Sequence, residues 1–486
     1  MPCCRPDDLK TIKWTSRRDF LRKAGAGFGV LGLAGLHQPA ALFSKNTASL
    51  NPLAPKPGHF PAKAKACISL FMYGGPSGID LFEPKPMLER MDGKSPPAGL
   101  NPFFGSDSIG QLMKSPYRFQ RHGKSGMWVS EVFPHLATCV DDIGFLKGCY
   151  VESNNHGPAL MQMNSGVTRI GHPTVGSWMV YGLGSENQNL PGYVVMYDHR
   201  GGPINGSQNW ASGFLPSYYQ ATPLRSSGSP MLNLATDPHM TREEQRRQLD
   251  LISKLGDEFR SKHPQESAIQ SRIETHELAF RMQMAAPSVL DISQESPETK
   301  SLYGIDKEIS RYFGIQCLMA RRLVEKGVRF IQLYSSGGNQ QTSWDAHFGL
   351  KENHDLHCPE TDQPIAGLIK DLKRRGMLDE TLLVWGGEFG RLPTSQKTER
   401  GSQGRDHNSE GFSMWMAGGG IQGGTSFGST DELGWKATEG RTSVNDIHAT
   451  ILHLMGIDHE RLTYNHNGRP YRLTDVSGRV INEILA

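Results

Sequence analysis

Short apolar runs that end at glycines recur along the chain. Residues 66–73 are almost continuously apolar, and the glycine-rich loop 74–78 follows them. A short run without alternation of polar and apolar residues is typical of a strand that is buried on both faces. Runs 328–334 and 381–385 have the same character and precede similar loops. The sequence therefore predicts three buried parallel strands.

Helical periodicity precedes two of these strands. Residues 309–326 show it until Gly327, and residues 365–375 show it until Gly376. A glycine after the last periodic residue is a common helix end. Helix, glycine, buried strand and polar loop, repeated in this order, predict an α/β fold with a doubly wound, mostly parallel sheet and helices on both faces. Functional side chains are then expected beyond the carboxyl ends of the strands.

The stretch 184–297 is less regular than the rest. It contains two charged helical segments, 241–262 and 266–284. We interpret it as an insertion or lid on one edge of the sheet.

The N-terminal segment has the pattern of a twin-arginine export signal. Residues 16–23 read Ser-Arg-Arg-Asp-Phe-Leu-Arg-Lys, and the glycine-rich apolar run 24–36 follows. This run is shorter than the roughly 20 residues that a spanning helix needs. We expect a signal over residues 1–46, a linker over 47–65 and one main domain over 66–486. The protein should be exported by the twin-arginine translocase to the periplasm or cell envelope, and an uncleaved anchor stays open because no cleavage site is evident.

Charge argues against nucleic acid as a partner. The formal net charge is +3, and eight basic against three acidic residues up to Asn46 give that segment +5. The rest of the chain is left at −2, which offers no basic surface for a polyanion. No second apolar run is long enough to cross a membrane, so the mature chain should have no spanning segment.

The cysteines do not form a disulfide framework. Five lie outside the signal, an odd number without a Cys-x-x-Cys motif: Cys67, Cys139, Cys149, Cys317 and Cys358. A single Cys139–Cys149 bridge remains open.

Polar clusters follow the later predicted strands. Asp345 and His347 are two residues apart, a spacing that places both on one side of an extended segment, where they could bind one metal. The other candidates in these loops are Glu388, Arg391, Arg405, Asp406 and His407, with His354 as a weaker one. Carboxylates and imidazoles suit Zn, Mn, Fe, Mg or Ca, so the divalent metal is not identified. The alternative is that these are hydrogen-bonded loop residues without a metal.

Two segments could hold an anion. His156 opens a predicted helix over 159–164, and helix N-termini present unpaired N–H groups. The loop 74–78 could do the same with its backbone. We take Gly75, Ser77 and Asn155 as the anion-binding candidates, although the glycine loop could equally be a plain turn.

Taken together, these segments resemble the DUF1501 family, which is abundant in planctomycetes and belongs to the alkaline-phosphatase and sulfatase superfamily. The likeness covers nearly the whole mature chain. It rests on residues 71–85, 154–159, 387–391, 404–407 and 446–457, the last of which is similar to a helix common in sulfatases. The resemblance implies an alkaline-phosphatase-like core.

The superfamily pattern can be carried over only in part. It implies a metal site built from Asp345, His347, Glu388 and His407, with Asp80 and Asp406 as weaker candidates. His156 stands where sulfatases have their Cys or Ser, so the formylglycine precursor is missing. Phe389 stands where a second ligand is usual. His156, or a water activated by the metal, would be the nucleophile, and Arg405 or Arg391 would hold the phosphate or sulfate.

The resemblance implies an exported, metal-dependent hydrolase of phosphate or sulfate esters, including esters of carbohydrates. The missing nucleophile supports an alternative, a non-catalytic cell-envelope binding or assembly protein on the same fold. Family members often neighbour genes for cytochrome-c-containing surface proteins, which makes an envelope protein the expected partner in that case. A third reading is a transferase that acts through a phosphohistidine at His156.

Overall fold

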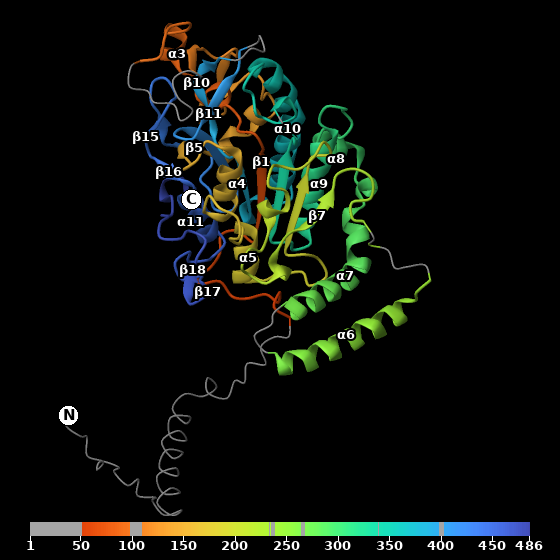
Figure 1. Ribbon diagram of the computed structural model, residues 1–486. Helices are drawn as coiled ribbons and strands as arrows, with labels where there is room; N and C mark the ends of the chain where they lie inside the picture. Colours follow the sequence, from red (N-terminus) through yellow and green to blue (C-terminus); the bar gives the residue numbers. More distant parts are fainter. Residues whose placement is uncertain are drawn as a thin grey trace, which may run out of the picture. The chain divides into compact units, whose positions relative to one another are not determined.

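A mostly parallel sheet runs through the chain (Figure 1). The computed structural model describes residues 51–97, 109–232, 234, 239–263, 268–338, 340–397 and 403–486, so the expected export signal lies outside the described residues. Within them, residues Leu53–Ala486 form one unit. Its sheet has nine strands in the order β13-β5-β12-β9-β1-β8-β6-β7, with β16 beside β5.

The three predicted strands lie side by side at the centre of this sheet. They are β1 (Ala66–Met72), β8 (Phe330–Ser335) and β9 (Thr381–Gly386), and β1 pairs parallel with both others. The further strands are β5 (Ile143–Tyr150), β6 (Tyr193–Tyr197), β7 (Thr222–Arg225), β12 (Phe412–Ala417), β13 (Thr425–Phe427) and β16 (Thr442–Ser443). Only β12 runs against its neighbours, so β5 points the same way as β9.

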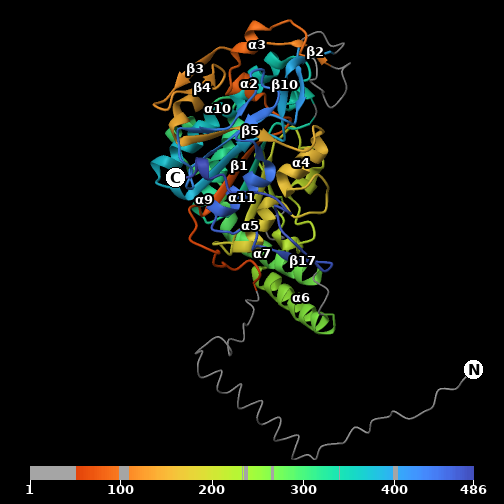
Figure 2. The ribbon, with the colours of Figure 1, turned by 90° about the vertical axis from the view of Figure 1, so that its left-hand side faces the viewer.

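Helices cover both faces of the sheet (Figures 1 and 2). Helices α9 (Arg311–Glu325) and α10 (Leu350–Arg374) share one buried cluster with Ile68 and Leu70 of β1. Helices α4 (His156–Ser165), α5 (Val175–Leu183) and α11 (Val444–Leu454) share the other with Cys67 and Phe71. Because neighbouring side chains of a strand point to opposite faces, β1 contributes to both cores. The predicted doubly wound α/β fold is confirmed.

Helix α10 is longer than predicted. It was expected over 365–375 but begins at Leu350 and contains Pro359 and Pro364. Proline usually marks a helix boundary, so a prediction from sequence places the start of α10 after these two prolines. His354 and His357 lie on this additional part and are fully buried.

The prediction of an insertion or lid over 184–297 is wrong in part. The segment supplies β6 and β7, the last two strands on one side of the central sheet, with β7 at its edge. Its helices are α6 (Arg242–Lys262) and α7 (Ala268–Leu290). Helix α6 lies at the end of the unit opposite β10 (Gly390–Gln396) and β11 (Arg405–Asn408), far from the loops that close the carboxyl end of the sheet (Figures 1 and 2). It therefore does not cover those loops.

A small antiparallel sheet, β11-β10-β2, stands at the carboxyl end of the central sheet, with β2 at Ile109–Leu112. The short helix α2 (Gly78–Leu81) is buried. The remaining elements are α3 (Pro86–Arg90), α8 (Pro297–Leu302), β3 (Phe119–His122), β4 (Met127–Ser130), β14 (Ser429–Thr430), β15 (Ala437–Glu439), β17 (Tyr464–His466) and β18 (Arg469–Tyr471). Cys139 and Cys149 are free, so the open disulfide does not form. No helix among the described residues has both the length and the apolar character of a membrane span.

Candidate metal centre

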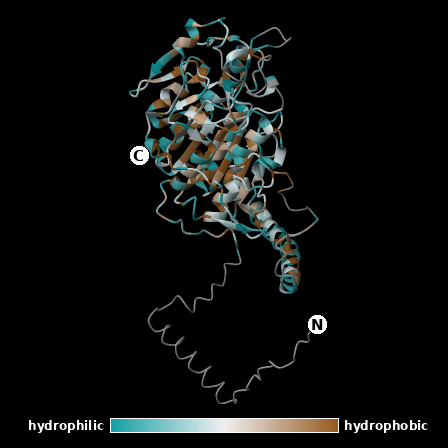
Figure 3. Cartoon of the chain, turned by 60° about the vertical axis from the view of Figure 1, so that its left-hand side comes forward, coloured by the Kyte–Doolittle hydropathy of each residue, from teal (hydrophilic) through white to brown (hydrophobic). Residues whose placement is uncertain are grey.

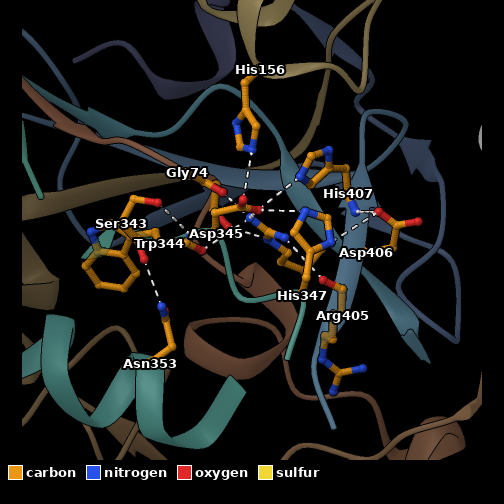
Figure 4. Close-up of polar contacts among 12 residues, drawn as sticks. Gly74, His156, Ser343, Trp344, Asp345, His347, Asn353, Arg405, Asp406 and His407 are labelled. Carbon is orange, nitrogen blue, oxygen red and sulfur yellow. Dashed lines mark hydrogen bonds and ion pairs between the residues drawn. The ribbon is translucent and has the colours of Figure 1, made fainter. Parts of the chain in front are cut away.

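Four side chains from distant parts of the chain meet at the carboxyl end of the sheet (Figure 4). Asp345 and His347 lie between β8 and α10, His156 is the first residue of α4 after β5, and His407 lies in β11. Their ligand atoms all lie within 4.8 Å of one another. The parallel order of β8 and β5 explains the meeting, since the loops after both strands emerge at one edge.

The three imidazoles point at one carboxylate. Nε2 of His347 lies 2.9 Å and Nε2 of His407 3.1 Å from Oδ1 of Asp345. Nε2 of His156 lies 3.3 Å from Oδ2 of Asp345. Asp345 and His407 are buried, whereas His156 and His347 are partly exposed, so a small ligand can reach the cluster.

The other ring nitrogen of each histidine contacts an oxygen. Nδ1 of His407 lies 2.5 Å from the carbonyl oxygen of Asn154, which can only accept, so this nitrogen carries a proton. Nδ1 of His347 contacts the side-chain oxygen of Gln396. Nδ1 of His156 lies 2.6 Å from Oε1 of Glu388. In a neutral imidazole that donates from Nδ1, the Nε2 atom bears a lone pair.

Protonation differs among these groups. Burial lowers the pKa of His407 to about 3, which keeps this ring neutral at physiological pH. Burial would also lower the pKa of His156, but hydrogen bonds to Asp345 and Glu388 outweigh it and raise that pKa to about 9. The pKa of Asp345 lies well below its usual value, because Arg391 and the histidines stabilise the carboxylate against the effect of burial.

Glu388 does not join the cluster as a ligand, contrary to the prediction. Its carboxylate is fully buried and accepts the N–H of Gly74 at 3.0 and 3.1 Å as well as contacting His156. A carboxylate on the far nitrogen of a metal-binding histidine fixes the ring and raises its basicity. His156, and not Glu388, belongs to the cluster that could hold a metal.

Phe389 forms an apolar wall of the cluster. Its ring centroid lies 4.9 Å from that of His156 and 4.3 Å from that of His407. It is fully buried, so it limits the movement of both imidazoles. The residue that breaks the superfamily pattern therefore packs against the ligands.

The predicted anion-binding role of Arg391 is wrong. The guanidinium is buried and pairs with Oδ1 of Asp345 at 2.8 Å. Its remaining N–H groups donate to backbone oxygens of Gly74, Gly75, Trp344 and Arg405. Arg391 therefore holds Asp345 in place, and its buried guanidinium is engaged by the protein itself.

Arg405 is also unavailable to an anion. Its side chain points away from the cluster (Figure 4) and pairs with Asp80 at 2.8 and 3.1 Å. Both side chains are fully buried. The prediction that Arg405 binds substrate and the weaker one that Asp80 binds metal are both wrong.

Three of the four backbone N–H groups of the glycine loop 74–78 donate within the protein, which argues against the loop as an anion cradle. Gly74 donates to Glu388, Gly75 donates to the carbonyl of Met72 at 3.4 Å, and Ser77 donates to Nε2 of His354 at 3.3 Å. The side chain of Ser77 donates to Asp80. His354 is thus buried behind the loop and lies outside the cluster.

Two further candidates lie at the border of the site. Asp406 lies 3.7 Å from Nδ1 of His347 and accepts the N–H of His407 at 2.8 Å, which supports two ligands without joining them. Asn155 is exposed and caps α4 by accepting the N–H of Gly157 at 3.4 Å. Its predicted role in anion binding stays a prediction.

Two glycines let the loops approach closely. A Cβ at Gly74 would lie 2.5 Å from the backbone nitrogen of Asp345, and the φ of Gly74 is +114°. A Cβ at Gly404 would lie 2.3 Å from the carbonyl carbon of His347. Backbone hydrogen bonds join the same loops, from Trp344 to Tyr73 and from Arg405 to Ala346, both at 2.9 Å.

Sequence reasoning did not place His156 in the cluster and missed the contacts from Asn154 and Gln396. The signal for His156 was its place at the start of a helix after a buried strand. Asn154 acts through its backbone oxygen, for which no side-chain pattern exists.

Comparisons with known proteins give a family and a set of distant structures. The family model described as "Protein of unknown function (DUF1501)" matches residues 64–485. None of the curated proteins matches the chain.

The solved structures that this chain resembles include a bacterial phosphatase, a bacterial sulfatase and a bacterial synthase. The alkaline phosphatase from the Antarctic bacterium TAB5 is 10% identical, covering 81% of this chain and 98% of that one, with a TM-score of 0.34. The sulfatase PsFucS1 from Pseudoalteromonas sp. is 12% identical, with 81% and 68% covered and a TM-score of 0.35. The lipoteichoic acid synthase LtaP from Listeria monocytogenes is 10% identical, with 91% and 82% covered and a TM-score of 0.33. Similarity at this level does not assign an activity.

Proposed function

Since this chain belongs to the DUF1501 family, whose description states no activity, we propose from its site that it is an exported, metal-dependent hydrolase of phosphate or sulfate esters. The metal would be held by His156, Asp345, His347 and His407. The substrate class includes esters of carbohydrates.

One observation carries the proposal. Three Nε2 atoms and a carboxylate face one another within 4.8 Å. The proton of His407 is held on its other nitrogen by a backbone carbonyl, so its lone pair faces Asp345 at 3.1 Å. The lone pair of His407 and the carboxylate of Asp345 repel each other at this distance unless a cation lies between them.

The donor set favours some metals over others. Three imidazoles and one carboxylate suit Zn, and also Mn or Fe, while Ca and Mg prefer oxygen ligands. When bound, such a metal polarises an ester oxygen and lowers the pKa of a water molecule.

The protein's own groups would prepare this site. Glu388 orients His156 and keeps its Nε2 turned inward. Arg391 compensates the charge of Asp345. Phe389 excludes water from one side of the rings of His156 and His407.

The internal hydrogen bonds and ion pairs of two arginines favour a second function. Arg391 and Arg405 both spend their guanidinium groups on the protein itself, so neither predicted cation is left to bind an ester anion. This observation supports a non-catalytic envelope binding or assembly protein that keeps the metal for its structure.

Activity against a panel of phosphate and sulfate esters separates the two functions. The hydrolase predicts turnover in the wild type that is lost in Asp345→Ala and His407→Ala and kept in the control His199→Ala, whose side chain contacts Asp198 instead of the cluster. Turnover that survives both cluster variants would contradict the hydrolase. A folded, metal-loaded protein without turnover that co-purifies with an envelope protein would support the second function.

Export is tested separately. Replacing Arg17 and Arg18 by lysine should keep the chain in the cytoplasm, because the twin-arginine pair is read directly by the translocase. Fractionation that still finds the double variant outside the cytoplasm would contradict this part of the proposal.

A further inference from the structure

A large cavity lies beside β7, separate from the metal centre. It is lined by residues of α7, α8 and α9 and by the segments 225–231 and 291–293. These helices and β7 lie together on the right-hand side of Figure 1. The cavity has a volume of about 1160 Å³, which is enough for a ligand of drug size. None of the four residues of the metal cluster lines it.

Much of the lining is apolar and packs on the main core. Leu290 and Met319 are 7% and 1% exposed and belong to that core. Met231, Ile292 and Ile315 are partly buried and pack against it. Figure 3 shows the apolar strands of the core in brown in the middle of the unit. Because the core holds these side chains in place, the cavity is formed before any ligand binds.

One hydroxyl in the lining is buried without a partner. Ser226 is 7% exposed, and its Oγ has no hydrogen-bond partner among the described residues. Burial of a hydroxyl without a hydrogen bond is unfavourable, and such atoms are uncommon in folded proteins. Since Ser226 lines the cavity, an acceptor atom of a ligand can supply the missing partner.

The charge of the lining favours an anion. Two basic side chains, Arg225 and Lys300, stand against one acidic side chain, Asp291. Asp291 accepts the N–H of Ser293 at 2.9 Å, and Lys300 donates to the carbonyl oxygen of Ser293 at 2.8 Å. The guanidinium of Arg225 makes no hydrogen bond or ion pair with the described residues. It therefore remains available to a negatively charged group.

We propose that this cavity binds a single-chain amphiphile with an anionic head, such as a long-chain carboxylate. The chain would lie against Leu290, Ile315 and Met319. Arg225 and Ser226 are consecutive and both line the cavity, so one carboxylate can accept hydrogen bonds from both. A carbohydrate fits this lining less well, because many of its hydroxyl groups would face apolar side chains. The proposal concerns a second site and does not rest on the proposed hydrolase.

Titration calorimetry of the full chain with dodecanoate tests the proposal. The wild type should bind about one equivalent. Dodecyltrimethylammonium has the same chain and the opposite charge, and should bind at least about tenfold more weakly. Octanoate should also bind at least about tenfold more weakly, because it buries fewer CH₂ groups. All three are used below their micellar concentrations.

Variants of the lining locate the ligand. Ser226→Ala should bind dodecanoate about tenfold more weakly, while the unliganded protein stays at least as stable as the wild type because an unpaired hydroxyl is removed. Arg225→Gln should reduce the preference for dodecanoate over dodecyltrimethylammonium. Ser130→Ala is the matched control, since Ser130 is 1% exposed, its Oγ also lacks a partner among the described residues, and it does not line the cavity.

A variant of the metal cluster separates this site from the metal centre. Asp345→Ala should bind dodecanoate with wild-type affinity, whereas loss of binding would place the carboxylate at the metal centre and overturn the proposal. A wild type that does not bind dodecanoate would also overturn it, as would equal affinity for the two head groups. The same holds if both Ser226→Ala and Arg225→Gln bind like the wild type.

Discussion

The carboxylate of Glu388 accepts the backbone N–H of Gly74 and lies 2.6 Å from Nδ1 of His156. It thereby links the loop after β1 to the first residue of α4. It also leaves Nε2 of His156 facing Asp345. The metal centre that we propose depends on this carboxylate without using it as a ligand.

Glu388→Gln should lower metal affinity without removing the site. Loss of such a carboxylate on a histidine ligand typically costs 10- to 100-fold in affinity, roughly the range we expect here. Competition with a chelator measures it. Glu83→Gln is the control, because Glu83 is a buried carboxylate bonded to Thr430, away from the cluster. Equal affinity in Glu388→Gln and wild type would show that Glu388 has no influence on the site.

Gly74→Ala should displace Asp345 and abolish metal binding. The added Cβ would lie 2.5 Å from the nitrogen of Asp345 and 2.7 Å from that of Trp344. Gly93→Ala is the matched control, since Gly93 also has a positive φ (+73°) but no atom within 4 Å of the new Cβ. The control should lose about 1–2 kcal/mol of stability and keep its metal. Metal binding by a folded Gly74→Ala protein would contradict the close packing described here.

Asp80→Asn should destabilise the fold by about 3–5 kcal/mol, because the guanidinium of Arg405 would be left buried without its partner charge. Denaturant unfolding measures the change. The control is Glu131→Gln, which removes an exposed pair with Arg118 at 2.8 Å and should cost less than about 1 kcal/mol. Similar losses in the two variants would mean that the buried pair has no special weight.

Asp362 should make the protein more stable as the pH falls from about 7 to about 4. Burial raises the pKa of its carboxyl to about 6, although it accepts the N–H groups of His135 and Leu136. A group whose pKa is higher in the folded state stabilises below its unfolded pKa, about 3.9 for Asp, and this contribution is lost as pH rises through the folded value.

The size of that contribution is about 2–3 kcal/mol, from a difference of roughly two pKa units. Urea unfolding of the wild type and of Asp362→Asn at several pH values measures it. The difference in unfolding free energy between the two proteins should change by this amount between pH 4 and 7. A difference that does not vary with pH would contradict the raised pKa.

Much of the fold follows from local patterns in the sequence. The buried strands at β1, β8 and β9 were predicted from apolar runs, and the helical periodicity of α9 from its spacing. The length of α10 was not predicted, because Pro359 and Pro364 are tolerated inside a helix that is stabilised by tertiary packing. Strands β6 and β7 were missed because 184–297 lacks the repeat that marks the other strands.

The site was predicted as far as side-chain type and strand order allow. Asp345, His347 and His407 were placed together correctly. Glu388 was predicted as a metal ligand and His156 as a nucleophile, whereas the structure places His156 in the cluster and Glu388 behind it. Sequence alone does not show which of two neighbouring groups faces inward. Arg391 and Arg405 were taken for substrate-binding residues because their buried partners, Asp345 and Asp80, are distant along the chain.

The metal content of the protein, folded and exported by its native route and purified without a metal-binding tag, tests the central claim most directly. We predict about one equivalent of Zn, Mn or Fe per chain, lost in both His156→Ala and His407→Ala and kept in His199→Ala. A well-folded wild type without metal, or a His156→Ala variant that keeps its full equivalent, would contradict the assignment of these four side chains as a metal centre.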